Sequence, residues 1–368
     1  MSWESIQLGE FITLKRGYDL PASQRKNGDI PVVSSSGVTG HHNEAKVEGP
    51  GVVTGRYGTL GEVFFIQEDF WPLNTALYIQ DFKGNDPRFS AYFLKSVLAG
   101  ISSNKAAVPG VNRNVLHARK VIVTRDPAQQ KAIAATLSAY DDLIENNRQR
   151  IELLEQAARL LYREWFVHLR FPGHEHVRIV DGVPEGWGKK PLSEIGNIIM
   201  GQSPKSIYYN EEGNGLPFHQ GVTNFGIRFP SHQTYCTVIN RLAEPGDILF
   251  SVRAPVGRIN ITPDKIVIGR GLAAIRSNCG QQNYLFYALK SHFFKEDMMG
   301  GGAIFAAITK KDLHGVELLQ ATDRIAEMFI EHIRPIDLQI ENLQQTIDSL
   351  SQARDLILPR LMNGEVTV

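Results

Sequence analysis

A basic side chain stands in a loop at two matched places in this chain, and the first of these loops also carries glycines and a tyrosine. The first loop is Thr54-Gly55-Arg56-Tyr57-Gly58 and the second is Ser251-Val252-Arg253-Ala254-Pro255, each after a run of strand-forming residues. An arginine can donate two hydrogen bonds to a guanine edge, and a tyrosine can stack on a base or contact a phosphate. These residues favour contact with DNA, although a surface arginine in a loop is also common without such a role.

Two further pairs of polar segments recur along the chain. Asn112-Arg113-Asn114 and Thr309-Lys310-Lys311 follow small residues at 106–110 and 300–303, which allow close approach to a phosphate backbone. The alternative is an ordinary helix start with polar residues in its first turn. Ser34-Ser35-Ser36-Gly37 and His219-Gln220-Gly221 form the third pair. We predict DNA contacts from Ser36, Gly37, Arg56, Tyr57, Lys105, Asn112, Arg113, Gln220, Asn224, Arg253, Arg258, Arg270, Lys310 and Lys311.

Motifs of catalysis and cofactor binding are missing from the sequence. There is no phosphate-binding loop of the Gly-x-x-x-x-Gly-Lys-Ser/Thr type and no Asn/Asp-Pro-Pro-aromatic motif of amino-methyltransferases. Gly55, Gly58 and Gly61 precede a strand pattern at 63–66, where a dinucleotide fingerprint requires a helix. Pro263-Asp264 lacks the acidic-x-Lys partner of a nuclease site and indicates a turn. We therefore expect a non-catalytic protein with no catalytic residue and no cofactor of its own.

Histidines and cysteines do not form a metal-binding pattern. His41-His42 and His174-Glu175-His176 have no third ligand nearby, so we predict no metal site. Cys236 and Cys279 lack metal-like spacing, and two cysteines do not make a disulfide framework. With neither a signal peptide nor an 18-residue apolar run, we expect a soluble, cytoplasmic protein.

The elements that position these loops occur twice. Trp3, Leu8, Glu10 and Gly17 recur 184 residues later as Trp187, Leu192, Glu194 and Gly201, and the offset drifts to 196 by Ile144-Glu145-Asn146, which recurs at 340–342. A repeat of this length indicates two copies of a domain, with approximate two-fold symmetry suited to duplex DNA. The net charge is zero, yet residues 1–125 and 185–320 each carry 14 basic and 11 acidic side chains, so the mild positive charge lies in the two copies.

Each copy ends in a long heptad pattern. The apolar positions, stepping by three and four, are Ile133, Leu137, Tyr140, Ile144, Asn147, Ile151, Leu154, Ala158, Leu161 and Trp165 in the first copy, and Phe329, Ile333, Ile336, Ile340, Leu343, Ile347, Leu350, Arg354, Ile357 and Leu361 in the second. Among these, we expect Ile144, Ile151, Leu154, Leu161, Ile340, Ile347, Leu350 and Ile357 to form the helix-to-helix seam.

The two helices are expected to pack antiparallel as a rod roughly 50 Å long, with one domain near each end. Arg354 is the one residue that does not fit the seam. Pro335 should kink or delay the second helix, and Pro359 should loosen its last turn. Asn147 either fixes the register of the pair or lies at its solvent edge.

Together these features resemble the specificity subunit of type I restriction-modification systems. The markers are the sequence of residues 126–134 (DPAQQKAIA), that of residues 143–147 (LIENN), and the closing LPRLMNGE at 358–365. The sequence departs from the family at 320–324 (QATDR), where the family usually keeps a Pro-x-x-x-Gln helix start, so the second helix is expected to begin differently.

The resemblance implies an α+β fold with two repeated target-recognition domains and an antiparallel coiled coil. We expect the first domain at 1–125, its spacer helix at 126–170, a connector at 171–186, the second domain at 187–320, its spacer helix at 321–363 and a tail at 364–368. The family reads bipartite double-stranded DNA, with the helices as a ruler. It also implies two docked modification subunits that carry S-adenosylmethionine, and separate restriction subunits.

The antiparallel rod adds a geometric expectation. Two domains near the ends of a rod of roughly 50 Å would contact bases within about 15 base pairs of each other. Because the two copies differ in almost every loop, the target should be asymmetric. The alternatives are a scaffold that does not bind DNA, and the specificity subunit of a related type II restriction-methylation complex.

Overall fold

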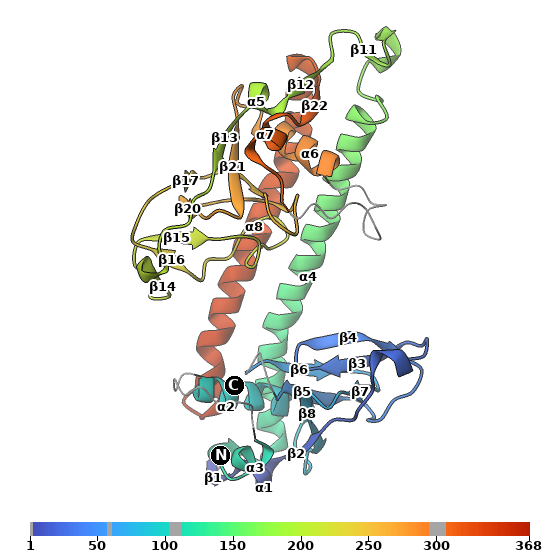
Figure 1. Cartoon of the computed structure of the whole chain (residues 1–368). Coiled ribbons are helices and arrows are strands. Elements are labelled where there is room, and N and C mark those ends of the chain that lie inside the picture. Colours follow the sequence, from blue (N-terminus) through green and yellow to red (C-terminus); the bar gives the residue numbers. More distant parts are fainter. Residues whose placement is uncertain (1–2, 57–60, 103–111, 294–306) are drawn as a thin grey trace. The chain divides into compact units, whose positions relative to one another are not determined.

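The computed structural model describes residues 3–56, 61–102, 112–293 and 307–368. It divides into two compact units, one made of Met1–Asn147 with Gln345–Val368 (unit 1) and the other of Arg148–Gln344 (unit 2). Each unit combines a globular α+β domain with parts of two long helices (Figure 1).

The domain of unit 1 is built on two small sheets. Its strands are β1 (Trp3–Gln7), β2 (Thr13–Arg16), β3 (Ile30–Ser34), β4 (Gly37–His42), β5 (Gly51–Gly55), β6 (Val63–Ile66), β7 (Trp71–Pro72), β8 (Ala76–Asp81) and β9 (Lys120–Thr124). An antiparallel sheet has the order β2-β8-β5-β6, a second has the order β4-β3-β7 with β3 and β7 parallel, and β1 pairs with β9. The helices are α1 (Leu8–Phe11), α2 (Pro87–Ser102) and α3 (Arg113–His117).

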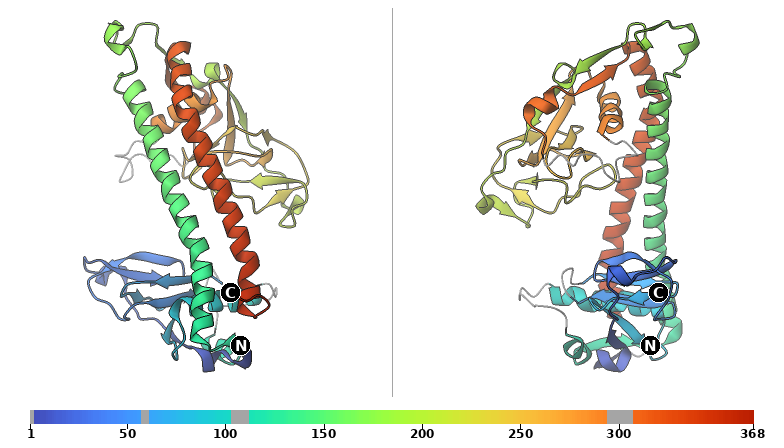
Figure 2. Two further views of the ribbon diagram at one scale, coloured as in Figure 1. Left: turned by 180° about the vertical axis from the view of Figure 1, so that it is seen from behind. Right: turned by 45° about the vertical axis from the view of Figure 1, so that its right-hand side comes forward.

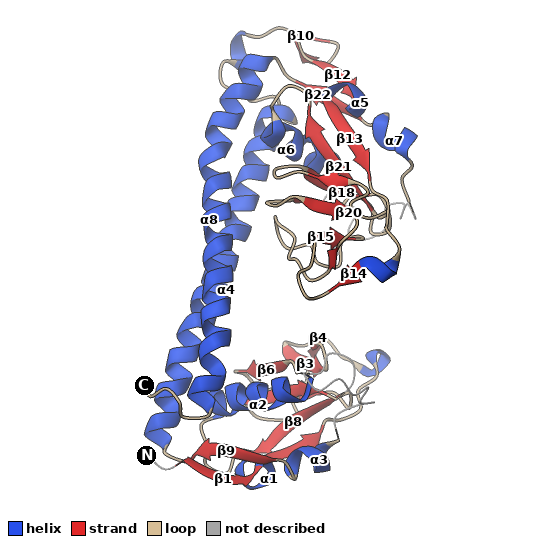
Figure 3. Cartoon of the chain, turned by 90° about the vertical axis from the view of Figure 1, so that its left-hand side faces the viewer, coloured by secondary structure: helices blue, strands red, loops and turns tan. Residues whose placement is uncertain are grey.

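The domain of unit 2 repeats this plan with more strands. Its strands are β10 (Ile179–Val180), β11 (Val183–Pro184), β12 (Gly188–Pro191), β13 (Gly196–Met200), β14 (Tyr209–Asn210), β15 (Leu216–His219), β16 (Tyr235–Cys236), β17 (Leu242–Ala243), β18 (Ile248–Ser251), β19 (Ile259–Ile261), β20 (Ile266–Ile268), β21 (Leu272–Ser277) and β22 (Glu317–Gln320). Its helices are α5 (Leu192–Ile195), α6 (Gln282–Phe293) and α7 (Lys310–His314). Figure 3 shows α6 beside the β13-β21-β18 sheet.

The two domains share one topology. The order β13-β21-β18-β19 corresponds to β2-β8-β5-β6, the parallel pair β15-β20 corresponds to β3-β7, and β12-β22 corresponds to β1-β9. The predicted strands at 30–33, 63–66 and 247–252 are confirmed as β3, β6 and β18. The internal repeat in the sequence is therefore a repeat of the α+β fold.

The two long helices are α4 (Pro127–Phe166) and α8 (Asp323–Met362). In unit 1, Ile133 of α4 shares a core with Leu361 of α8, whereas in unit 2 the ring of Trp165 lies 5.8 Å from that of Phe329. The start of each helix thus packs near the end of the other, and the predicted antiparallel pairing is confirmed within each unit. In both views of Figure 2 the paired segments run side by side.

The predicted seam is largely buried. Ile144, Ile151, Ile340 and Ile347 are 5% exposed or less, while Leu154, Leu161, Leu350 and Ile357 are half-buried. Full burial of one such side chain stabilises the fold by roughly 1.5–3 kcal/mol. Asn147 is also buried, which rules out its position at the solvent edge.

Three expectations for α8 need correction or explanation. The helix runs without interruption through Pro335, whose side chain is exposed, so Pro335 does not delay it. Despite the altered sequence at 320–324, α8 begins and ends 196 residues after α4, at equivalent positions. Arg354 is accommodated in the seam because its Nη1 bonds Asp141 Oδ1 of α4 at 2.6 Å. No described helix is long and apolar enough to span a membrane.

Candidate nucleic-acid interface

Loops of the unit 2 domain converge where the parallel strands β15 and β20 end. Gly269 N donates to His219 O (2.8 Å), and Gly271 N donates to Gln220 O (3.1 Å). Val252, after β18, joins them through its N–H to Gly271 O (2.9 Å). Because parallel strands end at the same sheet edge, the segments that follow them become neighbours. We call 201–203, 219–220, 252–253 and 269–271 the second loop cluster.

The residues after β13 complete this cluster. Gly201 N donates to Leu272 O, and a Cβ at Gly201 would lie 2.2 Å from Gly269 O, so only glycine allows this approach. Ser203 Oγ donates to Gln220 Oε1 (2.8 Å) and accepts from Arg270 N (3.1 Å). The exposed side chains of Gln220 and Arg270 are thereby held on one support.

Unit 1 forms a first loop cluster, residues 16–19, 33–37, 56 and 73–75, with the same backbone bonds. Gly17 N donates to Ala76 O and Arg56 N to Thr75 O, each at 3.1 Å. A Cβ at Gly17 would lie 2.3 Å from Leu73 O, as at Gly201. The side-chain amide of Asn74 donates to Asp19. At the equivalent place in the second cluster, the backbone N–H of Arg270 donates to Ser203 Oγ.

These equivalences correct one pairing made from the sequence. Arg56 N bonds Thr75 O as Val252 N bonds Gly271 O, at a constant offset of 196, so the counterpart of Arg56 is the buried Val252. Arg253 lies one residue further on and is exposed. A shift of one residue in extended chain turns a side chain to the opposite face, so Arg56 and Arg253 are not equivalent.

The matched pair that the sequence analysis missed is Asn74 with Arg270. Asn74 precedes β8, and its side-chain amide bonds the loop after β2. Arg270 precedes β21, and its backbone N–H bonds the loop after β13. Arg270 was predicted, but Asn74, Asp19 and Ser203 were not. Extending the helix offset of 196 back into the domains would have revealed this pairing.

The hydroxyl of Tyr18 belongs to the first loop cluster. Tyr18 Oη is 3.1 Å from Tyr78 Oη and accepts from Lys15 Nζ at 3.4 Å. The hydrogen bond with Tyr78, assisted by the charge of Lys15, lowers the pKa of Tyr18. Ser36 lies in the turn between β3 and β4, where Ser36 N donates to Ser34 Oγ (3.1 Å), and Gly37 begins β4.

The remaining predicted residues fall in several places. Tyr57 and Lys105 lie outside the described residues. Asn112 caps α3 by accepting from Asn114 N at 2.9 Å, which supports the helix-start interpretation for its side chain, and Arg113 beside it is exposed. Lys310 and Lys311 open α7 after its cap Thr309. Ile308 N bonds Val252 O (2.9 Å), which places this segment beside the second loop cluster.

Arg258 and Asn224 have other surroundings, although Ser251 N, directly before the second loop cluster, donates to Arg258 O at 2.9 Å. Arg258 lines a cavity of about 320 Å³ together with Glu152 and Arg159 of α4. Asn224 is half-buried and its carbonyl accepts from Ser231 N. The structure therefore brings Gln220, Arg253, Arg270, Lys310 and Lys311 near one another.

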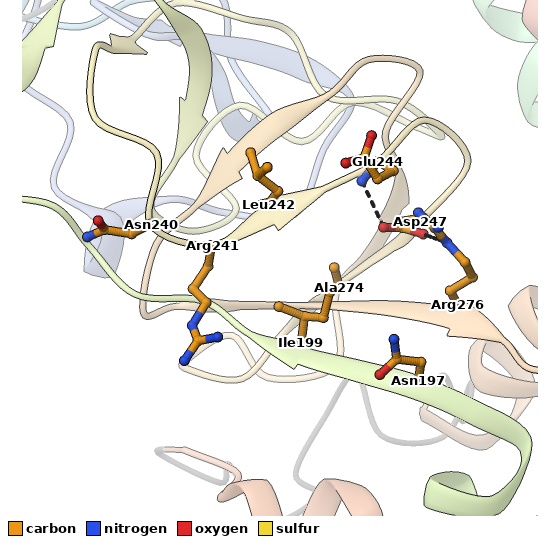
Figure 4. Close-up of a pocket in the computed structure, with 9 residues that line it drawn as sticks. All are labelled: Asn197, Ile199, Asn240, Arg241, Leu242, Glu244, Asp247, Ala274 and Arg276. Carbon is orange, nitrogen blue, oxygen red and sulfur yellow. Dashed lines mark hydrogen bonds and ion pairs between the residues drawn. The ribbon is translucent and has the colours of Figure 1, made fainter.

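A second polar hollow, of about 270 Å³, lies on the β13-β21 sheet and near β17. Figure 4 shows Arg241 and Arg276 at its sides, with Asp247 bonded to Arg276 and to the N–H of Glu244. The bond from Arg276 Nε to Asp247 Oδ1 (2.7 Å) raises the pKa of Arg276. Sequence reasoning did not identify this hollow, because its side chains come from four separate segments. Among the described residues, no group of histidine, cysteine and acidic side chains could hold a metal ion.

Comparison with known proteins gives a consistent result. Two relatives from Methanocaldococcus jannaschii are assigned as the MjaX and MjaIX type I restriction enzyme specificity subunits. They are 36% and 28% identical to this chain, over 65% and 66% of its length. The matches cover 58% and 60% of those proteins, so the chain spans about three fifths of the relatives it matches.

A solved structure and a sequence profile cover more of the chain. The S subunit of a type I restriction-modification system from M. genitalium superposes with a TM-score of 0.57 over 98% of this chain and 96% of its own, at 18% identity, and so shares the fold. The profile described as "Type I restriction modification DNA specificity domain" matches residues 1–156 and 184–319. Since both copies of the repeat match that profile, the chain belongs to the type I restriction modification DNA specificity domain family.

Proposed function

We propose that this protein is the non-catalytic specificity subunit of a type I restriction-modification complex and that each loop cluster reads one half of a bipartite DNA target. One observation carries the proposal: the two clusters share their backbone hydrogen bonds but present different side chains. A common support keeps the reading geometry. Different side chains on that support give two different half-sites, and hence an asymmetric target.

The side chains of the clusters suit base and phosphate contacts. Asn74 in the first cluster is of the type that pairs with adenine, and Arg270 in the second is of the type that pairs with guanine. Lys310 and Lys311 beside the second cluster, and Arg113 at α3, are suited to phosphates, which position a protein on the duplex without reading sequence.

The partner subunits would supply the chemistry. The proposed modification subunits carry S-adenosylmethionine and methylate adenine, and restriction subunits complete the complex. An exposed apolar stripe supports docking on the helices: Leu153 and Leu160 on α4, and Val167 just beyond it, repeat every seven residues and are more than half exposed. Leu356 on α8, 196 residues after Leu160, is 74% exposed. Exposed leucines at matched positions suit two copies of one partner.

The test is selection of bound duplexes from a random library by the full chain co-expressed with its modification subunits. We expect two short, unlike motifs at one fixed spacing. Arg270→Ala, Arg253→Ala and Arg56→Ala should each weaken binding by about 1–3 kcal/mol, and relax the preference at one base, wherever that arginine reads a base. Lys189→Ala, which removes an exposed charge on β12 outside both clusters, is the matched control.

Two results would count against this function. Binding without any enriched motif would favour a scaffold with non-specific affinity for DNA. Loss of binding in Lys189→Ala equal to that in Arg270→Ala would show that net charge, and not the loop cluster, determines affinity.

A further inference from the structure

A buried ionic cluster ties the second domain to both long helices. Arg228 donates through Nε to Glu155 of α4, through Nη1 to Asp337 Oδ1 of α8 (2.8 Å), and through Nη2 to Tyr287 Oη of α6 (2.7 Å). Tyr287 Oη in turn donates to Asp337 Oδ1 (2.8 Å), and Lys290 Nζ to Glu155 Oε2 (2.7 Å). We call these five residues the second anchor.

The centre of the cluster is buried. Arg228 is 2% exposed and Tyr287 1%. The guanidinium carbon of Arg228 also lies 4.5 Å from the centre of the Phe286 ring. Two carboxylates face two cations, so the charges within the anchor balance. Buried ion pairs of this kind add little net stability compared with apolar packing, but their directional bonds hold one geometry.

The same contact occurs in the first copy. Tyr92 of α2 donates to Asp141 Oδ2 of α4 at 2.5 Å, and Arg354 of α8 donates to Asp141 Oδ1 at 2.6 Å. Tyr92 and Tyr287 occupy the same position in α2 and α6, and Asp141 and Asp337 are 196 residues apart. We call Tyr92, Asp141 and Arg354 the first anchor. It is more open, since the Asp141 side chain is 38% exposed.

The repeat of this contact indicates a role beyond local packing. In both copies a tyrosine from the domain helix bonds an aspartate on a long helix, although the neighbouring charges differ. The second anchor alone also includes a residue from the loop between β15 and β16, Arg228, whose backbone O accepts from Ile261 N. It therefore joins the sheet, α6, α4 and α8 at one point.

We propose that the second anchor fixes the orientation of the second domain on the helix pair and thereby restricts the spacing between the two half-sites that the protein accepts. This inference rests on the proposed function. Loosening the anchor should permit a small rotation of the domain. Duplexes with one base pair more or fewer between the half-sites would then be tolerated, while the half-sites themselves stay the same.

The experiment uses the full chain with its modification subunits and a library in which only the spacing varies. Tyr287→Phe removes a single hydroxyl from the anchor. We expect the preference for the best spacing over its neighbours to fall by about threefold to tenfold, which is the size of effect that loss of one buried hydrogen bond produces. The enriched half-site motifs should be unchanged.

Tyr284→Phe is the matched control. Tyr284 is a buried tyrosine on the same helix whose hydroxyl donates to Leu319 O at 2.6 Å, outside the anchor. The Tyr284→Phe substitution should destabilise the domain to a similar extent as Tyr287→Phe, and it should leave the spacing preference unaltered. Asp337→Asn, which keeps the shape of the side chain, is the second anchor variant and decides the matter if Tyr287→Phe does not fold.

The outcomes separate the two proposals. Unchanged spacing in the anchor variants, or equal broadening in Tyr284→Phe, overturns the role of the anchor while the wild type still selects a bipartite target. A wild type that enriches no motif overturns the proposed function and this inference with it.

Discussion

A chain of hydrogen-bonded side chains starts at the buried His219 of the second loop cluster and runs outward to the exposed Asp264. His219 is 2% exposed, its Nε2 lies 2.8 Å from His232 Nδ1, and His232 Nε2 lies 3.1 Å from Asp264 Oδ2. Burial, together with the charge of His232, lowers the pKa of His219 to about 4 from 6.5. His219 is thus neutral in the folded protein over a range where the unfolded chain would already bind a proton.

This difference predicts a pH dependence of stability. Between pH 6.5 and about 4 the unfolded state binds the His219 proton and the folded state does not, so the unfolding free energy should fall as the pH falls through that window. His219→Gln should flatten this part of the curve, measured by urea unfolding followed through tryptophan fluorescence. Parallel curves for the variant and the wild type across that window would contradict the assignment.

Glu155 contributes in a lower pH window. Burial raises the pKa of Glu155, but Arg228 and Lys290 outweigh it and hold the pKa below its ordinary value. A carboxylate of this kind stabilises the fold above its unfolded pKa and loses that contribution as the pH falls towards its folded pKa. The pH dependence of the unfolding free energy that remains in the His219→Gln variant should therefore lie at lower pH than the window assigned to His219.

At the scale of elements, the helices could be predicted from the sequence and the anchors could not. The heptad steps placed Ile144, Ile151, Ile340 and Ile347 in the seam because a helix buries every third and fourth residue. No local period links Arg228 to Glu155 or Asp337, since these residues come from a loop and two separate helices. Arg354 did not fit the seam for the same reason: its partner Asp141 lies on the other helix.

The loops show a similar limit. Glycines such as Gly17 and Gly201 signalled the repeat, and the close backbone approach explains why they are glycines. Which loops would meet depended on the parallel pairing of β3 with β7 and of β15 with β20, which short strands do not specify in sequence. The predicted DNA contacts of the loop residues remain predictions.

Pro335 supplies a prediction at this scale. It sits inside α8 at an exposed position, where proline lacks the N–H that would bond the preceding turn. Because proline in a helix interior is less favourable than alanine by about 3 kcal/mol, Pro335→Ala should raise the unfolding free energy by roughly 1–3 kcal/mol. Thermal and urea unfolding of the two proteins would measure it. A less stable variant would mean that α8 relies on a distortion at this residue.

At the scale of the whole molecule, the repeat should apply to partners as well as to DNA. Leu160 on α4 and Leu356 on α8 occupy equivalent positions, and both remain exposed, at 54% and 74%. A leucine that stays in water at the same place in both copies is best explained by a partner that covers it twice. Each helix would then carry one modification subunit.

Single substitutions should accordingly remove the subunits one at a time. Placing a charge in an apolar contact forfeits roughly 1.5–3 kcal/mol of burial, which weakens that contact by about 10- to 100-fold. Leu160→Glu and Leu356→Glu should each reduce the complex from two modification subunits to one, as measured by native mass spectrometry, and the double variant should bind none. Leu338→Glu is the control, because Leu338 is 52% exposed but its counterpart in α4 is Asp142. Equal losses in all three single variants would instead indicate that any charge on the helices disturbs assembly, and would remove the repeated docking surface.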